Sequence, residues 1–270
     1  MAAKFIRGIN LFYDDLGSGS PIVFVHGQPF NRSMWKYQVE YFQHNYRLII
    51  PDLRGYGQSK TNDHIVLLDE IALDIMYLLD ELQIEKAIFC GLSMGGQILL
   101  DIYRLFPHRV KALIIADSDA RGESEESYRN RLALANRLLS KGMHQYTSEH
   151  IHEYIGSNTQ TTRPDAYQHL FEMMTSTDAA GAAAVQRGRA DRRDHVSILS
   201  SIKVPALIIV GSEDYFTPLP VAAIMAENIP GAQFISIDDA GHMPNMERPE
   251  EFNAAVSSFL NQNNFLPLEK

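Results

Sequence analysis

The sequence predicts an α/β fold built on a mostly parallel central sheet, with flanking helices and an inserted helical segment. Short apolar runs alternate with helical patterns along most of the chain, and this alternation indicates parallel strands joined by crossover helices. Between about residues 121 and 194 it gives way to successive helical patterns without a convincing strand. We therefore expect one domain, with a core of residues 1–120 and 195–270 and a helical cap of residues 121–194.

The expected strands are short runs that end in turn residues. Several are apolar on both faces, which indicates burial between two layers of helices, as in a parallel sheet. The first segment instead alternates and predicts one or two strands. Strands are expected over residues 5–16, 21–25, 46–50, 87–90, 110–116, 204–211 and 232–237.

Between these strands, apolar residues recur at helical spacing. The clearest stripe consists of Ile71, Ile75, Leu78, Leu79 and Leu82, which recur at i, i+4, i+7, i+8 and i+11. Further helices of the core are expected over residues 35–42, 95–106, 221–225 and 252–260.

Composition limits the classes of partner. The chain has 270 residues, of which 45% are hydrophobic, and this is enough for one substantial core. Its formal net charge is -9 and no stretch concentrates Lys and Arg, so binding to nucleic acid is disfavoured. No Cys/His spacing matches a zinc site and no glycine-rich nucleotide motif follows a strand, so neither a metal nor a nucleotide cofactor is indicated.

The N-terminal segment and the cysteine content favour a cytoplasmic protein. Residues 1–7 lack the continuous apolar region of a signal peptide, and no window approaches the length of a membrane span. The single cysteine, Cys90, can form no internal disulfide and falls in an expected buried strand. We expect a cytoplasmic monomer or homodimer that acts on a small molecule and has no membrane partner.

The segment from Gly91 to Gly96, Gly-Leu-Ser-Met-Gly-Gly, is the most informative motif. Ser93 lies where an apolar strand turns abruptly into a helix. A serine on so sharp a turn has a strained backbone, and the glycines two positions away on either side let the neighbouring segments approach closely. The motif therefore predicts that Ser93 is a nucleophile.

A serine nucleophile needs a neutral imidazole to accept its proton, and the imidazole needs an acceptor for its other nitrogen. Of the ten histidines, His242 follows the last expected strand, at the sheet edge where Ser93 emerges, and is the predicted base. His26 lies at the same edge, but its place directly after a buried strand favours hydrogen bonds to nearby backbone.

The predicted acid is Asp214, in the loop after the penultimate strand and beside the loop of His242. Its neighbour Glu213 is an alternative, as are Asp117 and Asp119 after an earlier strand. For each of them the competing interpretation is a solvated loop carboxylate.

The tetrahedral intermediate of acyl transfer needs hydrogen-bond donors aimed at its oxyanion. Met94 follows the predicted nucleophile and begins a helix, so its backbone N–H is free to bind an anion. Gln28, in the loop after the strand 21–25, is the expected second donor.

The order of Ser93, Asp214 and His242 along the chain, together with the Gly-x-Ser-x-Gly turn, resembles the α/β-hydrolase superfamily. The pair His26-Gly27 and the segment 52–59 share this resemblance, which covers nearly the whole chain except the cap. It implies the α/β-hydrolase fold and a serine hydrolase.

Within that superfamily, the stretches 112–118 and 241–249 resemble those of small carboxylesterases and 3-oxoadipate enol-lactonase-like enzymes. The resemblance implies hydrolysis of a small ester or lactone through an acyl-enzyme. Haloalkane dehalogenases and epoxide hydrolases use an aspartate nucleophile, so Ser93 argues against both.

Other functions stay open beside the hydrolysis of esters or lactones. The same three residues could serve a carbon–carbon bond hydrolase or a cofactor-free perhydrolase, because these differ in pocket shape rather than in motif. A ligand receptor built on a hydrolase scaffold is a third possibility.

The cap bears on the substrate. Its apolar Leu, Met and Phe residues suggest an acyl- or ring-binding pocket of modest size, but such a stripe more often reflects packing between helices. Four arginines near its end could recognise a substrate carboxylate: Arg187, Arg189, Arg192 and Arg193. The sequence favours a simpler interpretation, a solvated face paired with Asp191 and Asp194.

Overall fold

A computed structural model describes residues 1–265 and contains one eight-stranded sheet. The strand order is β1-β2-β4-β3-β5-β6-β7-β8. β1 and β2 pair antiparallel, β2 also pairs antiparallel with β4, and the other strands run parallel. The strands are β1 (Ala2–Ile6), β2 (Ile9–Leu16), β3 (Pro21–Val25), β4 (Arg47–Pro51), β5 (Ala87–Leu92), β6 (Val110–Ala116), β7 (Ala206–Gly211) and β8 (Gln233–Ile237).

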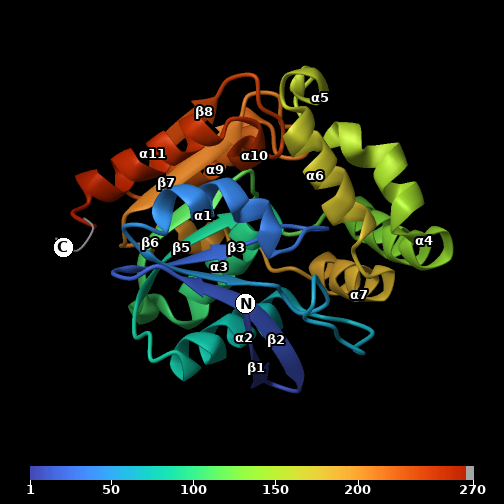
Figure 1. Cartoon of the computed structure of the whole chain (residues 1–270), viewed down its shortest axis with the longest axis horizontal. Coiled ribbons are helices and arrows are strands. Elements are labelled where there is room, and N and C mark those ends of the chain that lie inside the picture. Colours follow the sequence, from blue (N-terminus) through green and yellow to red (C-terminus); the bar gives the residue numbers. More distant parts are fainter. Residues whose placement is uncertain (266–270) are drawn as a thin grey trace.

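Helices cover both faces of this sheet, which explains why its central strands are apolar on both sides. α1 packs against α11, and α2 packs against α3. Figure 1 shows α1 above the central strands and α2 below them. The core helices are α1 (Lys36–Phe42), α2 (Leu68–Glu81), α3 (Met94–Leu105), α9 (Leu219–Asn228), α10 (Pro244–Glu247) and α11 (Pro249–Gln262). The mostly parallel α/β fold predicted from the sequence is confirmed.

Single turns of 3₁₀-helix precede or follow several elements. The helix expected over residues 35–42 divides into such a turn and α1, and Asn31 caps the turn by accepting from the Ser33 N–H at 2.9 Å. The 3₁₀ turns are η1 (Arg32–Trp35), η2 (Pro107–Arg109) and η3 (Ile151–Glu153).

Between β6 and β7 the chain forms helices and no strand, and this whole stretch lies within the described residues. Figure 1 shows α4, α6 and α7 grouped beside one end of the sheet. α4 packs against both α6 and α7, and its path breaks at Gly142. The helices are α4 (Glu125–His150), α5 (Thr159–Thr162), α6 (Pro164–Thr175), α7 (Ala179–Ala190) and α8 (Val196–Leu199).

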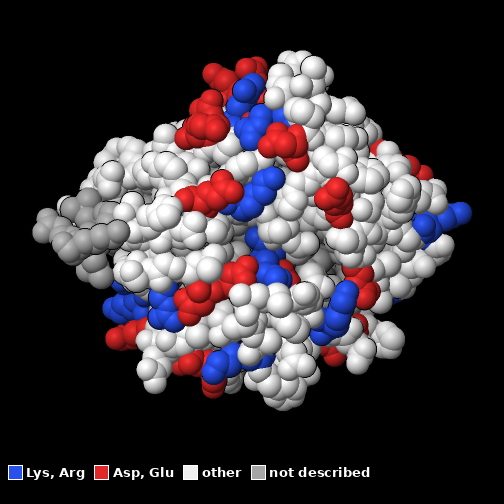
Figure 2. Space-filling view, viewed as in Figure 1, with Lys and Arg blue, Asp and Glu red and all other residues white. Residues whose placement is uncertain are grey.

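Charged side chains of both signs occur on the face of the molecule that Figure 2 shows. On the face seen in Figure 2, red and blue groups are interspersed, without a continuous basic area. Among residues 1–265, no helix combines the length and apolar character needed to cross a membrane.

The Glu247 carboxylate connects the helical segment with the core through hydrogen bonds to both. This buried side chain accepts hydrogen bonds from the backbone N–H groups of Gly241 (2.9 Å) and Met243 (3.1 Å), in the loop after β8. It also accepts from the Gly156 N–H (2.7 Å) and the Thr159 hydroxyl, which precede and begin α5. Burial raises the pKa of the Glu247 carboxyl, and the four donors oppose that rise. One carboxylate therefore joins two segments far apart in sequence.

Replacing Glu247 by glutamine should destabilise the protein. The Glu247→Gln amide keeps one acceptor oxygen and turns its NH₂ group toward backbone donors, so at least one buried N–H loses its partner. Because hydrogen bonds to charged groups contribute about 1.5–3 kcal/mol each, we expect the free energy of unfolding to fall by roughly 2–3 kcal/mol. Urea unfolding monitored by circular dichroism measures this change.

The matched control is Glu250→Gln, on the first turn of the next helix, where the side chain is 82% exposed. Surface substitutions of this kind usually change stability by less than about 0.5 kcal/mol. Equal unfolding midpoints for the two variants would contradict the role given to Glu247.

Candidate active site

Ser93 occupies the turn between β5 and α3 in a strained conformation. Its φ is 55° and its ψ is -118°, a region that costs a residue with a side chain about 1–3 kcal/mol. Two hydrogen bonds hold it there: the Ser93 N–H donates to the Ala116 carbonyl (2.9 Å), and the Ser118 hydroxyl donates to the Ser93 carbonyl (2.7 Å). Both partners belong to β6 and the loop that follows it, so the neighbouring strand fixes the turn.

The glycines on either side of Ser93 are required by close approach. A Cβ atom on Gly91 would lie 2.6 Å from the carbonyl carbon of Gly95, and one on Gly95 would lie 2.1 Å from the Val25 carbonyl oxygen. Real Cβ atoms do not come so close to backbone, so only glycine lets α3 begin directly against β3 and β5.

His242 and Asp214 form a buried pair. The Nδ1 atom of His242 lies 2.9 and 3.0 Å from the two carboxylate oxygens of Asp214. Asp214 also accepts from the Phe216 N–H (2.9 Å) and the Thr217 hydroxyl. Burial acts to raise the pKa of Asp214, but His242 and these two donors outweigh it and hold the pKa below its usual value. An ionised Asp214 favours the proton on Nδ1, which leaves Nε2 free to accept another.

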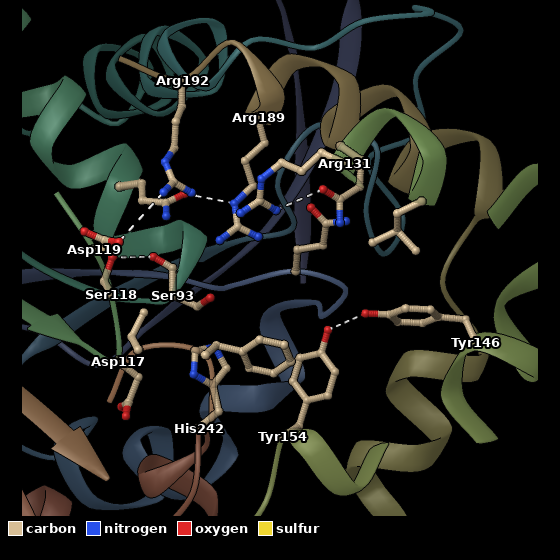
Figure 3. Close-up of a pocket in the computed structure, with 16 residues that line it drawn as sticks. Ser93, Asp117, Ser118, Asp119, Arg131, Tyr146, Tyr154, Arg189, Arg192 and His242 are labelled. Carbon is tan, nitrogen blue, oxygen red and sulfur yellow. Dashed lines mark hydrogen bonds and ion pairs between the residues drawn. The ribbon is translucent and has the colours of Figure 1, made fainter. Parts of the chain in front are cut away.

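Ser93 and His242 face one cavity of about 170 Å³. Figure 3 shows the Ser93 side chain above that of His242, with Tyr154 to the right of His242. The cavity is lined by Gln28, Ser93, Gln97, Asp117, Ser118, Asp119, Arg131, Leu134, Tyr146, Tyr154, Gln186, Arg189, Arg192, Phe216, Thr217 and His242.

The two expected oxyanion donors lie near Ser93. Met94 is the first residue of α3, where backbone N–H groups have no partner within the helix. Gln28 follows β3 and lines the cavity, and its buried side-chain oxygen has no hydrogen-bond partner among residues 1–265.

His26 uses both ring nitrogens in backbone hydrogen bonds. Its Nδ1 lies 2.7 Å from the Gly27 carbonyl, and its Nε2 accepts from the Leu53 N–H at 3.0 Å. Burial lowers its pKa to about 4, so the ring is neutral. This is the backbone-bonding role that the sequence favoured for His26.

The alternative acids lie in different surroundings. Asp119 pairs with Arg121, and Glu213 accepts from the Ser157 N–H. Asp117 is buried at the end of β6, where one carboxyl oxygen accepts from the Gly211 N–H (2.8 Å) and the other has no partner within the described part of the chain. Burial, and then the negative charge of Asp214, raise the pKa of Asp117 well above its usual value.

Asp117, Asp214 and His242 are also the group of side chains that could hold a metal ion, because their ligand atoms lie within 4.8 Å of one another. Within this group, His242 and Asp214 hydrogen bond to each other, and one oxygen of Asp117 accepts from the Gly211 N–H.

The structure corrects one expectation for the helical segment. Arg189 and Arg192 line the cavity, and Arg192 pairs with Glu123 rather than with Asp191 or Asp194, so the prediction of a solvated face is wrong for these two arginines.

The apolar side chains of the helical segment follow the simpler interpretation, packing between helices. Met173 and Met174 are buried in the core packing and do not line the cavity. The cavity wall is largely polar, and its apolar content comes from Leu134, Phe216 and the bodies of the tyrosines.

Several lining residues were not singled out from the sequence. Arg131 lies on α4, and the hydroxyls of Tyr146 and Tyr154 form a buried hydrogen bond of 2.7 Å. None of the three falls in a recognisable motif, and only the fold of the helical segment brings them to the cavity that Ser93 lines.

Comparisons with known proteins identify the family of the chain. A model of the alpha/beta hydrolase family matches residues 22–255. The chain is 31% identical over 243 residues to 3-oxoadipate enol-lactonase 1 of Acinetobacter baylyi, with 88% of each chain covered.

Solved structures give the same result. An esterase from Thermogutta terrifontis with malate bound is 33% identical and has a TM-score of 0.93, over 97% of this chain and 98% of that one. The enol-lactonase from Burkholderia xenovorans LB400 is 27% identical and has a TM-score of 0.89, over 96% and 100% of the two chains. The protein described here therefore belongs to the alpha/beta hydrolase family.

Proposed function

We propose that the protein is a carboxylic ester hydrolase that cleaves small esters or lactones through an acyl-enzyme. Ser93 is the nucleophile, His242 the base and Asp214 the acid that orients it. The observation that carries the proposal is that the strained Ser93 lines the same cavity as His242, whose other face pairs with the buried Asp214. The esterase and enol-lactonase names of the relatives support the same reaction class.

In the first half of the reaction, the Ser93 Oγ attacks the carbonyl carbon while His242 Nε2 accepts the hydroxyl proton. The electron pair of the C=O bond moves to oxygen, which accepts hydrogen bonds from the backbone N–H groups of Met94 and Gln28. Collapse of this intermediate breaks the ester bond, and His242 gives its proton to the leaving oxygen.

In the second half, water attacks the acyl group on Ser93 by the same route. His242 accepts the proton from water and returns it to the Ser93 oxygen as the acid product leaves. Asp214 stays ionised throughout and stabilises the imidazolium that forms in each half. With a lactone, the leaving oxygen remains attached to the acyl chain.

The helical segment 121–194 is proposed to act as a cap that selects the substrate. Arg131, Tyr146 and Arg189 come from this segment, whereas Ser93 and His242 come from the sheet side. This division of labour explains how one set of reacting groups serves relatives with different substrates.

The direct test is steady-state hydrolysis of p-nitrophenyl butyrate. We expect Ser93→Ala to lower kcat by at least about 10³-fold, and Asp214→Asn by about 10³–10⁴-fold, because the amide favours the wrong tautomer of His242. Asp117→Asn is the matched control, since it makes the same carboxyl-to-amide change in the same cluster at a group that is already neutral.

Retention of full turnover by Ser93→Ala would refute the proposal. Loss of activity in Asp117→Asn with retention in Asp214→Asn would transfer the acid role to Asp117. Parallel assays of peracid formation from acetate and hydrogen peroxide measure whether the acyl group passes to peroxide instead of water.

The raised pKa of Asp117 predicts how the stability of the protein depends on pH. The shift means that the folded protein keeps a proton that the unfolded chain releases above a pH of about 3.9. Wild-type stability therefore falls by up to about 1.4 kcal/mol per pH unit from this group as pH rises above that value, and Asp117→Asn removes the dependence.

We therefore expect the stability of Asp117→Asn relative to wild type to increase between pH 5 and pH 7, as measured by urea unfolding. A difference that stays constant or reverses over this range would show that Asp117 is ionised in the folded protein.

A further inference from the structure

The cavity above Ser93 contains a concentration of positive charge. Arg131 comes from α4, Arg189 from α7, and Arg192 from the segment just after α7. Figure 3 shows their three guanidinium groups gathered at one side of the cavity, close to Ser93 and Ser118. The arginines come from separate parts of the helical segment and converge on the space that a substrate would fill.

Nearby carboxylates balance only part of this charge. A single Glu123 oxygen lies 2.5 Å from Arg131 Nε and 2.5 Å from Arg192 Nη1. Asp119, the other acid on this side, is held by Arg121 at 2.8 Å and lies 4.0 Å from Arg192. Glu123 is therefore shared between Arg131 and Arg192, and Asp119 is held mainly by Arg121.

Of the three arginines that line the cavity, Arg189 is the one without an ion pair among the described residues. Its Nε donates to the side-chain oxygen of Gln97 at 2.9 Å, and it forms no salt bridge within residues 1–265. Burial, followed by the charges of Arg131 and Arg192, lowers the pKa of Arg189 well below its usual value. Arginine stays protonated in proteins, so Arg189 carries a buried charge at a cost in free energy. A bound anion would offset that cost.

The remaining lining disfavours a purely apolar substrate. Gln97 and Gln186 present amide groups, and the paired hydroxyls of Tyr146 and Tyr154 add polar atoms. An uncharged acyl chain beside Arg189 would leave the guanidinium desolvated and unpaired, which selects against such substrates.

We propose that Arg189, flanked by Arg131 and Arg192, binds a carboxylate group of the substrate. This inference rests on the proposed ester hydrolysis at Ser93 and narrows it to half-esters of short dicarboxylic acids and to lactones that carry a free carboxylate. The planar guanidinium fork matches a carboxylate in two parallel hydrogen bonds, and a cavity of about 170 Å³ suits a short chain.

The kinetic test compares monomethyl succinate with methyl levulinate, in which a methyl ketone replaces the carboxylate at nearly the same size. We expect wild-type kcat/KM to favour monomethyl succinate by at least about tenfold, and Arg189→Gln to remove that preference, because a hydrogen-bonded charge pair is worth about tenfold or more. Arg189→Lys should keep part of the preference, since it retains the charge and loses the fork.

The matched control is Arg187→Gln, two residues earlier on α7. Arg187 donates to the His64 carbonyl and to Asn136 and does not line the cavity. We expect this variant to keep the wild-type preference, and circular dichroism melting checks that both variants are folded.

A binding experiment tests the anion site independently of ester hydrolysis. Isothermal titration of Ser93→Ala with succinate, its neutral diamide and inorganic phosphate requires no turnover. We expect succinate to bind, the diamide to bind at least tenfold more weakly, and Arg189→Gln in the same background to weaken succinate binding at least tenfold.

The outcomes are distinguishable. If esters are cleaved but the charged ester is not preferred and succinate does not bind, the anion site is wrong while the hydrolase stands. If no ester is cleaved but succinate binds through Arg189, the hydrolase proposal fails and the anion site stands. Tighter binding of phosphate than of succinate would overturn the assignment to a carboxylate.

Discussion

The backbone of Ser93 is the constraint on which the rest of the site depends. A side-chain-bearing residue at a φ of 55° persists only where its surroundings over-determine it. Here β6 supplies the Ala116 carbonyl and the Ser118 hydroxyl on one side, and Gly95 permits van der Waals contact with β3 on the other. The sheet therefore aims Ser93 into the cavity at a cost that the tightly packed core offsets.

The proposed acid and base lie beside a second carboxyl group whose pKa is shifted in the opposite direction to that of Asp214. His242 and two further donors hold the pKa of Asp214 below its usual value, whereas burial and the charge of Asp214 raise the pKa of Asp117 well above its own. Glu247 accepts hydrogen bonds on both sides of His242, from Gly241 and Met243, and also binds the helical segment. The loop that carries the imidazole is thus fixed to both halves of the molecule.

The sequence predicted the sheet and the neighbourhood of Ser93 because these follow from local patterns. Strands that are buried on both faces are apolar runs, and a strand-to-helix turn at a glycine-flanked serine is a local signature. His242 and Asp214 follow strands at the same sheet edge, so parallel topology alone brings them together.

The arginines were misjudged because their surroundings depend on packing between distant segments. Arg189 bonds Gln97 on α3, and Arg192 bonds Glu123 and the Arg121 carbonyl before α4. Nearby Asp191 and Asp194 in the sequence suggested local pairing that the fold does not use. Nor does charge pattern reveal which face of α7 turns inward, since an alanine-rich helix has little amphipathic signal.

The central claim, that Ser93 is activated by His242, is tested most directly by covalent trapping. Wild-type protein and a His242→Ala variant are treated with a fluorophosphonate, digested and mapped by mass spectrometry over time. The account predicts rapid formation of a phosphonyl adduct on the peptide containing Ser93 in the wild type, and at least about 10³-fold slower labelling in the variant. An adduct on another residue, or equal labelling rates in the two proteins, would contradict it.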